Sequence, residues 1–125
     1  MDLRGAILAA DDIGKEIMEI SEWQVDGAPA RIELRGINGS QRAEMLDTCM
    51  VPHGEKGESK FSFRLAHPKI VRMGVYDPAT GQPLFVESDE PHIALKAGGV
   101  IDRIAQKLFE LSGMTSEEKK KVGKP

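Results

Sequence analysis

Residues 93–111, IALKAGGVIDRIAQKLFEL, carry the strongest periodic pattern of the chain. Apolar side chains recur every three or four residues, as on one face of an amphipathic helix. Gly98 and Gly99 each cost about 1 kcal/mol relative to alanine inside a helix, so we expect a kink or a break into two helices there. The sequence SDEP at residues 88–91 is typical of a helix start, and Gly113 of a helix end. The apolar face comprises Ile93, Ala97, Val100, Ile104, Leu108 and Leu111, and Ile101 and Phe109 widen it.

Two alternating stretches precede this helix. Residues 15–23 alternate apolar and charged side chains and end on Trp23, and residues 30–36 show the clearest period of two in the chain. Between them, DGAP at residues 26–29 supplies turn-forming glycine and proline. The pattern therefore predicts an antiparallel hairpin over residues 15–36.

The next segment predicts a short helix. Asn38 can cap its first turn and Gln41 can reach back from the third position, so we expect a helix from Ser40 to about Met50. Residues 51–60 combine Pro and Gly with charges and predict a mobile loop. At the N-terminus, residues 2–10 predict one or two loose helical turns, because Gly5 weakens the helical spacing.

Residues 61–65 predict a strand, which His67 and Pro68 interrupt, and residues 70–86 predict a second pair of strands. Apolar residues alternate over residues 61–65, and residues 70–76 are rich in β-forming side chains. A turn at DPATG, residues 77–81, would return the chain as a strand over residues 82–86. A helix over residues 69–76, opened by Pro68 at its first position, is the alternative.

Together these elements predict an α+β fold: a small antiparallel sheet of hairpins, one short helix and a long C-terminal amphipathic helix. At 125 residues the chain fits one domain, which we assign to residues 1–114. Residues 115–125 form a short charged tail that we expect to be disordered, because it has little apolar surface to bury.

Composition narrows the function classes. The net charge is −3, which argues against nucleic acid as a partner. The apolar run at residues 6–10 is too short and too acidic in its flanks for a membrane span or signal peptide. The single cysteine, Cys49, excludes an internal disulfide and favours a reducing compartment, so we expect a cytoplasmic protein.

Catalytic and metal-binding patterns are weak. His53, His67 and His92 are scattered without metal-ligand spacing, and no glycine-rich phosphate loop is present in the sequence. A hydrolase would need His67 or His92 beside Cys49. We therefore expect no enzyme, no metal and no cofactor, and we favour a binding protein.

Five ordered motifs support a more specific interpretation. They are ILAADD (7–12), ISEW (20–23), LRGING (34–39), YDPATGQPLF (76–85) and LFELSGM (108–114). In this order, over nearly the whole chain, they resemble the tail assembly chaperones of long-tailed, siphovirus-type bacteriophages. Residues 51–65 have no close counterpart in this pattern.

The resemblance implies a function without catalysis. Such chaperones coat the helical tape measure protein, keep it soluble and help recruit tail tube protein, which polymerises around it; a homo-oligomer fits this role. They act in the host cell cytoplasm and are expected to be absent from the mature virion. A longer form often arises by a −1 ribosomal frameshift, for which the codons of Lys119, Lys120, Lys121, Gly123 and Lys124 are candidates.

A structural tail component, such as a terminator or connector subunit, is the alternative function. Mass spectrometry of purified particles separates the two, because a chaperone should be absent from them. For the partner-binding surface we predict the end of the apolar helical face: Ile101, Ile104, Leu108, Phe109, Leu111 and Met114.

Overall fold

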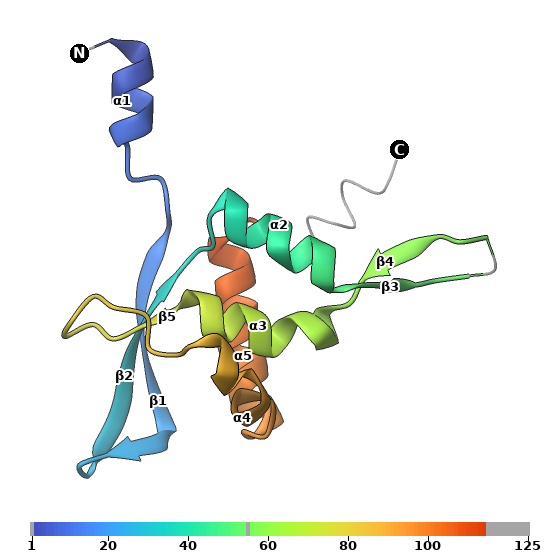
Figure 1. The fold of residues 1–125 in the computed structure, drawn as a ribbon. Helices are drawn as coiled ribbons and strands as arrows, with labels where there is room; N and C mark the ends of the chain where they lie inside the picture. The colour runs from blue at the N-terminus through green and yellow to red at the C-terminus, as the bar shows by residue number, and fades with distance from the viewer. Residues whose placement is uncertain (1, 55, 115–125) are drawn as a thin grey trace.

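The protein has an α+β fold in which helices pack on one face of a small antiparallel sheet (Figure 1). The computed structural model describes residues 2–54 and 56–114, so the expected charged tail lies outside the described residues. In chain order the elements are α1 (Leu3–Ala9), β1 (Lys15–Val25), β2 (Ala28–Arg35), α2 (Gly39–Thr48), β3 (Met50–Pro52), β4 (Ser59–Phe61), α3 (Phe63–Gly74), β5 (Val75–Tyr76), the 3-10 turn η1 (Glu87–Asp89), α4 (Glu90–Ala94) and α5 (Gly98–Leu111).

The predicted hairpin is confirmed. β1 pairs antiparallel with β2, from Lys15 opposite Arg35 to Val25 opposite Ala28, and β5 joins on the other side of β2. The two turn residues, Asp26 and Gly27, have positive φ angles of 52° and 80°. Two such residues make the turn whose twist matches that of paired strands. The register set at the turn then shifts between Ile20 and Gln24, so the strands beyond this irregularity pair in a different register.

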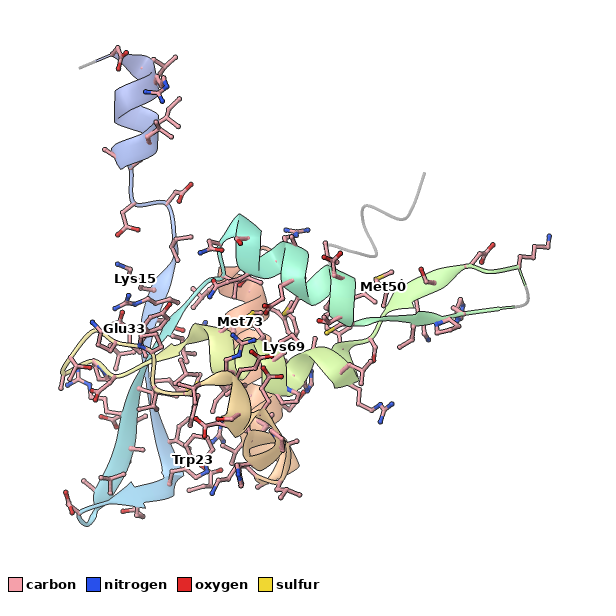
Figure 2. All side chains as sticks on the ribbon, in the orientation of Figure 1. Lys15, Trp23, Glu33, Met50, Lys69 and Met73 are labelled. Atoms are coloured by element: carbon pink, nitrogen blue, oxygen red, sulfur yellow. The ribbon has the colours of Figure 1, made fainter. Side chains whose placement is uncertain are left out.

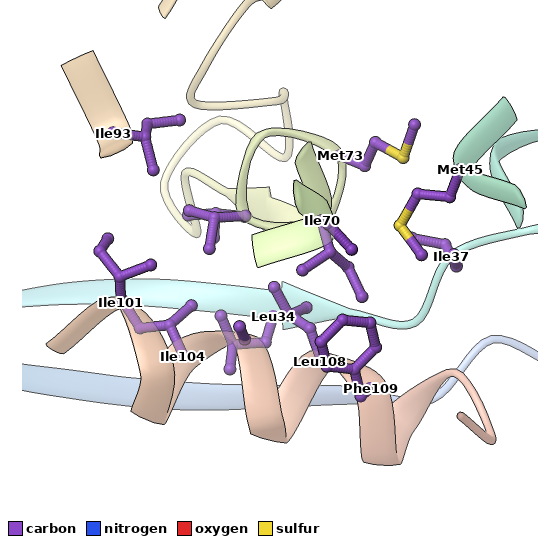
Figure 3. Close-up of a cluster of buried hydrophobic side chains, with 14 of the residues drawn as sticks. Leu34, Ile37, Met45, Ile70, Met73, Ile93, Ile101, Ile104, Leu108 and Phe109 are labelled. Atoms are coloured by element: carbon purple, nitrogen blue, oxygen red, sulfur yellow. The ribbon is translucent and has the colours of Figure 1, made fainter. Parts of the chain in front are cut away.

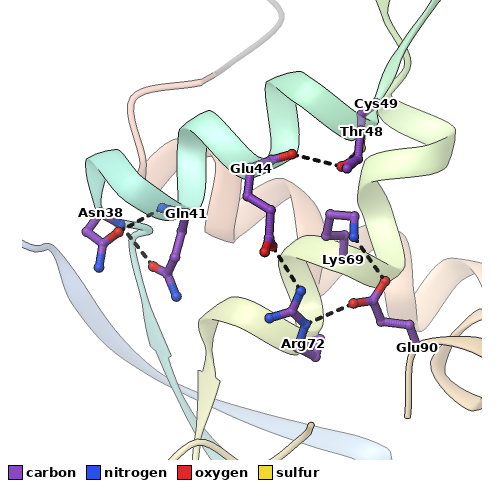
Figure 4. A network of polar contacts seen from close by, with 8 residues as sticks. All are labelled: Asn38, Gln41, Glu44, Thr48, Cys49, Lys69, Arg72 and Glu90. Atoms are coloured by element: carbon purple, nitrogen blue, oxygen red, sulfur yellow. Dashed lines mark hydrogen bonds and ion pairs between the residues drawn. The ribbon is translucent and has the colours of Figure 1, made fainter. Parts of the chain in front are cut away.

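The capped helix is also confirmed. The backbone N–H of Gln41 donates to Asn38 Oδ1 over 2.8 Å, and the backbone N–H of Asn38 donates to Gln41 Oε1 over 3.0 Å (Figure 4). These reciprocal bonds satisfy two N–H groups that the first turn leaves unpaired. The helix ends at Thr48, two residues before the expected end.

The strands predicted over residues 61–76 are largely wrong. Residues 63–74 form α3, and Ser62 caps it by accepting the N–H of Leu65. Pro68 lies inside this helix rather than at its start, so the alternative also began the helix too late. Within residues 61–76, only Phe61, the last residue of β4, and Val75 and Tyr76 of β5 lie in strands. Residues 82–86 return merely as a bridge from Tyr76 to Pro83. The β-forming side chains Ile70 and Val71 are fully buried in α3, so tertiary packing overrides their propensity.

Residues 51–60 differ from the expected loop as well. β3 and β4 form a short hairpin in which Met50 lies opposite Phe61 and Pro52 opposite Ser59. Apolar residues at its base join the body of the protein, since Phe61 is buried. The hairpin extends from that base away from the sheet (Figure 1).

The C-terminal helix is interrupted as the glycine pair predicts. α4 ends at Ala94, and α5 begins at Gly98. Gly113, with φ of 69°, ends α5. The N–H of Met114 donates to the carbonyl of Phe109 over 2.7 Å, and the N–H of Gly113 donates to that of Glu110 over 3.1 Å. This pair of bonds is the Schellman motif, which stops the helix at a defined residue.

One cluster of buried side chains holds these elements together. Leu34 of β2, Ile70 of α3 and Leu108 of α5 meet at its centre and are fully buried (Figure 3). Two glycines allow neighbouring elements to approach closely here. A Cβ added to Gly36 would clash with the carbonyl oxygen of Leu111. A Cβ added to Gly74 would lie 2.5 Å from Leu108 Cδ2. The absence of a side chain at these positions lets α5 and α3 reach the sheet.

Gly36→Ala tests this close approach. The added methyl group meets backbone, which cannot rotate away, so we expect a loss of about 1–3 kcal/mol in the free energy of unfolding. Gly39→Ala at the start of α2 is the matched control, because a Cβ there meets nothing within 4 Å. Urea denaturation followed by circular dichroism measures both variants. Equal midpoints would contradict the close approach of α5 to β2.

Candidate partner-binding surface

The structure places most of the predicted partner-binding residues in the core. Ile104 and Leu108 are fully buried, while Phe109 and Ile101 keep 4% and 6% of their surfaces exposed. The cause is that the apolar face of α5 packs against both the hairpin and α3. A partner can reach these four side chains only at the edges of Phe109 and Ile101. Leu111 and Met114, by contrast, are partly exposed and pack against the rim of the core.

Two of the predicted residues line a surface hollow, which we call the C-terminal groove. It has a volume of about 420 Å³ and is lined by Phe63, His67, Asp102, Gln106, Phe109, Glu110 and Met114. Its floor is aromatic: Phe63 meets Phe109 edge-to-face with ring centres 5.0 Å apart, and His67 lies 5.9 Å from Phe109. Phe61 meets Phe63 in the same way at 5.0 Å, which fixes the position of the floor.

The C-terminal groove combines an apolar floor with an acidic rim. Asp102 and Glu110 stand along α5, held by Gln106 at 3.0 Å and Lys107 at 3.4 Å. Met114 adds to the lining a flexible side chain that can adapt to several shapes. Such a groove suits an apolar side chain projecting from a helix that also carries basic residues.

Two further hollows flank the junction between α4 and α5. The tryptophan hollow, about 400 Å³, is lined by Trp23, Phe85, Asp89, His92, Ile93, Lys96 and Ile101. Trp23 lies on the side of β1 that faces α4 (Figure 2). The junction hollow, also about 400 Å³, lies between the start of α3 and the α4–α5 turn. Its apolar lining includes Leu65, Pro68, Ala94 and Ile101, and its cations are Arg64 and Lys96.

The sequence pattern missed the contributions of Phe63, Trp23 and Phe85. Each comes from a different element, and the fold brings them beside α4 or α5. A large aromatic side chain near the end of a hairpin, such as Trp23, was the one available signal, but periodicity does not show which helix it meets. The residues raised for a hydrolase do not form one cluster either: His67 lies against Phe109, His92 lines the tryptophan hollow, and the buried Cys49 contacts Thr48 Oγ1 at 3.7 Å.

A polar network ties three helices together behind these hollows (Figure 4). Arg72 of α3 donates to Glu90 of α4 over 2.9 Å and to Glu44 of α2 over 3.1 Å, and Lys69 lies 3.4 Å from Glu90. Burial acts to lower the pKa of Arg72, but the hydrogen bonds to Glu90 and Glu44 outweigh it and the pKa is raised. Arg72 therefore stays charged and orients α4 on α3.

Ion pairs also fix the hairpin on α5. Arg103 lies 2.7 Å from Glu22, and Lys107 lies 3.2 Å from Glu16. The hydrogen bond from Arg103 is the main cause that lowers the pKa of Glu22 from 4.5 to about 2. Because both pairs are exposed, each contributes little to the free energy of unfolding. Their role is to hold β1 against α5.

The pKa of Glu22 gives a pH prediction. Because its folded pKa lies below the unfolded one, the pair stabilises the fold above pH 4.5, and this contribution disappears as the pH falls from 4.5 to about 2. We expect an NMR titration of the side-chain carboxyl carbon of Glu22 to give a midpoint near 2. In Arg103→Gln the midpoint should move up toward 4.5, whereas Arg64→Gln should leave it unchanged. An unchanged midpoint in Arg103→Gln would contradict the pairing.

Comparisons with known proteins place the fold. No family model matches the chain, and no curated protein matches its sequence. None of the helices in residues 2–54 and 56–114 is long and apolar enough to cross a membrane. Among solved structures, the fold is that of a phage tail assembly chaperone.

One matching structure is the tail assembly chaperone of bacteriophage HK97, with a TM-score of 0.55. The match covers 87% of this chain and 91% of that chain, at 16% sequence identity. The resemblance inferred from the sequence motifs is thus confirmed for the fold. At this identity, contact residues do not carry over individually, so the surface has to be argued from this chain's own side chains.

Proposed function

We propose that this chain is a phage tail assembly chaperone that binds and solubilises the tape measure protein and assists polymerisation of the tail tube protein. The observation that carries the proposal is the fold shared with the HK97 chaperone over most of both chains. The ordered sequence motifs support it independently of the fold. In this proposal residues 1–114 act as one domain without catalysis, in the host cell cytoplasm, as a homo-oligomer that leaves before the virion is complete.

The C-terminal groove is the surface that we assign to the tape measure protein. A long helical partner exposes apolar side chains until the tube encloses it, and the aromatic floor around Phe63 and Phe109 can accept one such side chain per chaperone. The acidic rim at Asp102 and Glu110 favours partner segments with Lys or Arg next to the apolar residue. Many small contacts of this kind hold a long partner firmly yet release one at a time.

Met114→Asp tests this assignment. A carboxylate in the lining of the groove must lose its hydration when the partner's apolar side chain enters, so we expect about tenfold weaker binding. The measurement is co-purification of the tape measure protein after co-expression, followed by titration with a peptide from it. Thermal unfolding of the variant shows whether the fold is intact.

Leu84→Asp is the matched control. Leu84 is 43% exposed and lies outside the C-terminal groove, so the same charge introduced there should leave binding unchanged. Equal binding by Met114→Asp and the unmodified chain would show that the tape measure protein uses another surface.

A longer form produced by a −1 frameshift belongs to the same proposal. The candidate codons are those of residues 119–124, which lie outside the described residues. We expect the coding DNA there to contain a slippery heptamer within an A-rich or GGGAAA tract, followed by an open −1 reading frame. Immunoblotting for this domain should then detect a minor, longer product, and a closed −1 frame would exclude that product.

A further inference from the structure

The C-terminal groove carries more negative charge than the fold neutralises. Its lining includes the carboxylates of Asp102 and Glu110 and no lysine or arginine. In the described part of the chain Asp102 forms no ion pair, and its hydrogen-bond donor, Gln106, is neutral. Glu110 shares Lys107 with Glu16, at 3.4 and 3.2 Å. The groove can therefore accept further cations.

The charged rim is a straight row that leads to the end of the described chain. Asp102, Gln106 and Glu110 follow one another at four-residue spacing, so they lie along one side of α5. From Asp102 to Glu110 this row is about 12 Å long. Met114, which comes next at the same spacing, belongs to the same lining. Whatever follows Met114 in the chain therefore begins beside the groove.

The residues that follow Met114 carry chemistry that matches the groove. Residues 115–125 read TSEEKKKVGKP and lie outside the described part of the chain. They contain four lysines against two glutamates, and the apolar Val122 lies between Lys121 and Lys124. An apolar side chain flanked by cations is what an aromatic floor with an acidic rim selects.

The chain is long enough to make this contact within one molecule. Residues 115–118 span at most about 14 Å, so Lys119 and the lysines after it can reach either end of the row. A less extended path leaves slack for Val122 to turn toward the floor. Because the segment is tethered at Met114, its effective concentration at the groove is in the millimolar range. A contact between a few exposed charges is weak, but at such a concentration it can be populated.

We infer that residues 119–124 occupy the C-terminal groove of their own chain, with lysine ammonium groups against Asp102 and Glu110. Its consequence rests on the proposed function: the segment competes with the tape measure protein for the groove and covers it until that partner arrives. A long partner with many linked contacts displaces one weak segment from each copy. A frame change at codons 119–124 replaces the residues after it, so the longer form would differ in this competition.

Paramagnetic relaxation in NMR spectra of the full chain measures the contact. A nitroxide label on Gly123→Cys broadens the amide signals of residues near it, and the native Cys49 is only 1% exposed, so the label attaches at position 123. Asp102 should lose most of its signal intensity, whereas Gly27, in the turn between β1 and β2, should keep it. In about 0.5 M salt the loss at Asp102 should shrink, because salt screens exposed charges.

Neutral variants separate the charge contact from the tether. The tail variant replaces the three consecutive lysines: Lys119→Gln, Lys120→Gln and Lys121→Gln. It keeps the length of the segment, so the remaining broadening at Asp102 is that of a tethered segment without the contact. The control variant removes the same charge from exposed lysines outside the groove and should match the unmodified chain: Lys56→Gln, Lys60→Gln and Lys96→Gln.

The groove side is tested by Asp102→Asn. Asparagine keeps an oxygen for Gln106 and removes the charge, so the broadening at Gln106 should fall as it does in the tail variant. Asp47→Asn on the exposed side of α2 is the matched control and should leave the broadening unchanged.

Three results would overturn the inference. They are equal broadening at Asp102 in the unmodified chain and the tail variant, intact broadening in Asp102→Asn, and broadening that appears only between a spin-labelled chain and a second, isotope-labelled chain. The last result would place the segment on another copy.

Titration with a tape measure peptide tests the proposed function separately. If the segment occupies the groove about three-quarters of the time, the tail variant should bind the peptide about fourfold more tightly than the unmodified chain. Intact broadening with equal peptide affinities would contradict the groove as the tape measure site and support the segment in the groove. Absence of the broadening would overturn the inference and leave the proposed function standing.

Discussion

The burial of α5 between the hairpin and α3 is the contact on which the rest of the structure depends. A two-stranded hairpin is marginal in water, and it becomes stable here because Leu34 packs against Leu108 from the helix. The close fit is locked by polar bonds at the helix end: Ser112 Oγ accepts the N–H of Ile37 over 3.0 Å and donates to the carbonyl of Leu108 over 2.6 Å. A single serine thus joins the end of α5 to the segment between β2 and α2.

This use of α5 decides where a partner can bind. The apolar face of α5 covers one side of the hairpin and one side of α3, so nearly all of this face is buried. What remains accessible is the border between elements, where Met114, Phe63 and Trp23 add side chains from outside the helix. Each hollow therefore combines a floor from the core with side chains from neighbouring elements at its edge.

Elements with local signals could be predicted from the sequence. β2 has a clear period of two and follows a two-residue turn, and α2 has a complete capping box, so the sequence predicts both from local signals. The region of α3 needs tertiary information. Phe61, Phe63 and Leu65 alternate as in a strand, but Ser62 can equally cap a helix. The packing of Ile70 in the core favours the helix. Periodicity likewise identified the apolar face of α5 but not what covers it. The predicted residues therefore fell mainly in the core, and the aromatic residues from other elements were missed.

The exposure of α1 has the same cause, since the buried cluster is formed by residues of the other elements. The core is closed without it, so Leu3 and Ile7 are absent from the buried cluster and stay exposed. A seven-residue helix with no packed face depends on its local cap, in which Asp2 Oδ1 accepts the N–H of Gly5 over 2.8 Å.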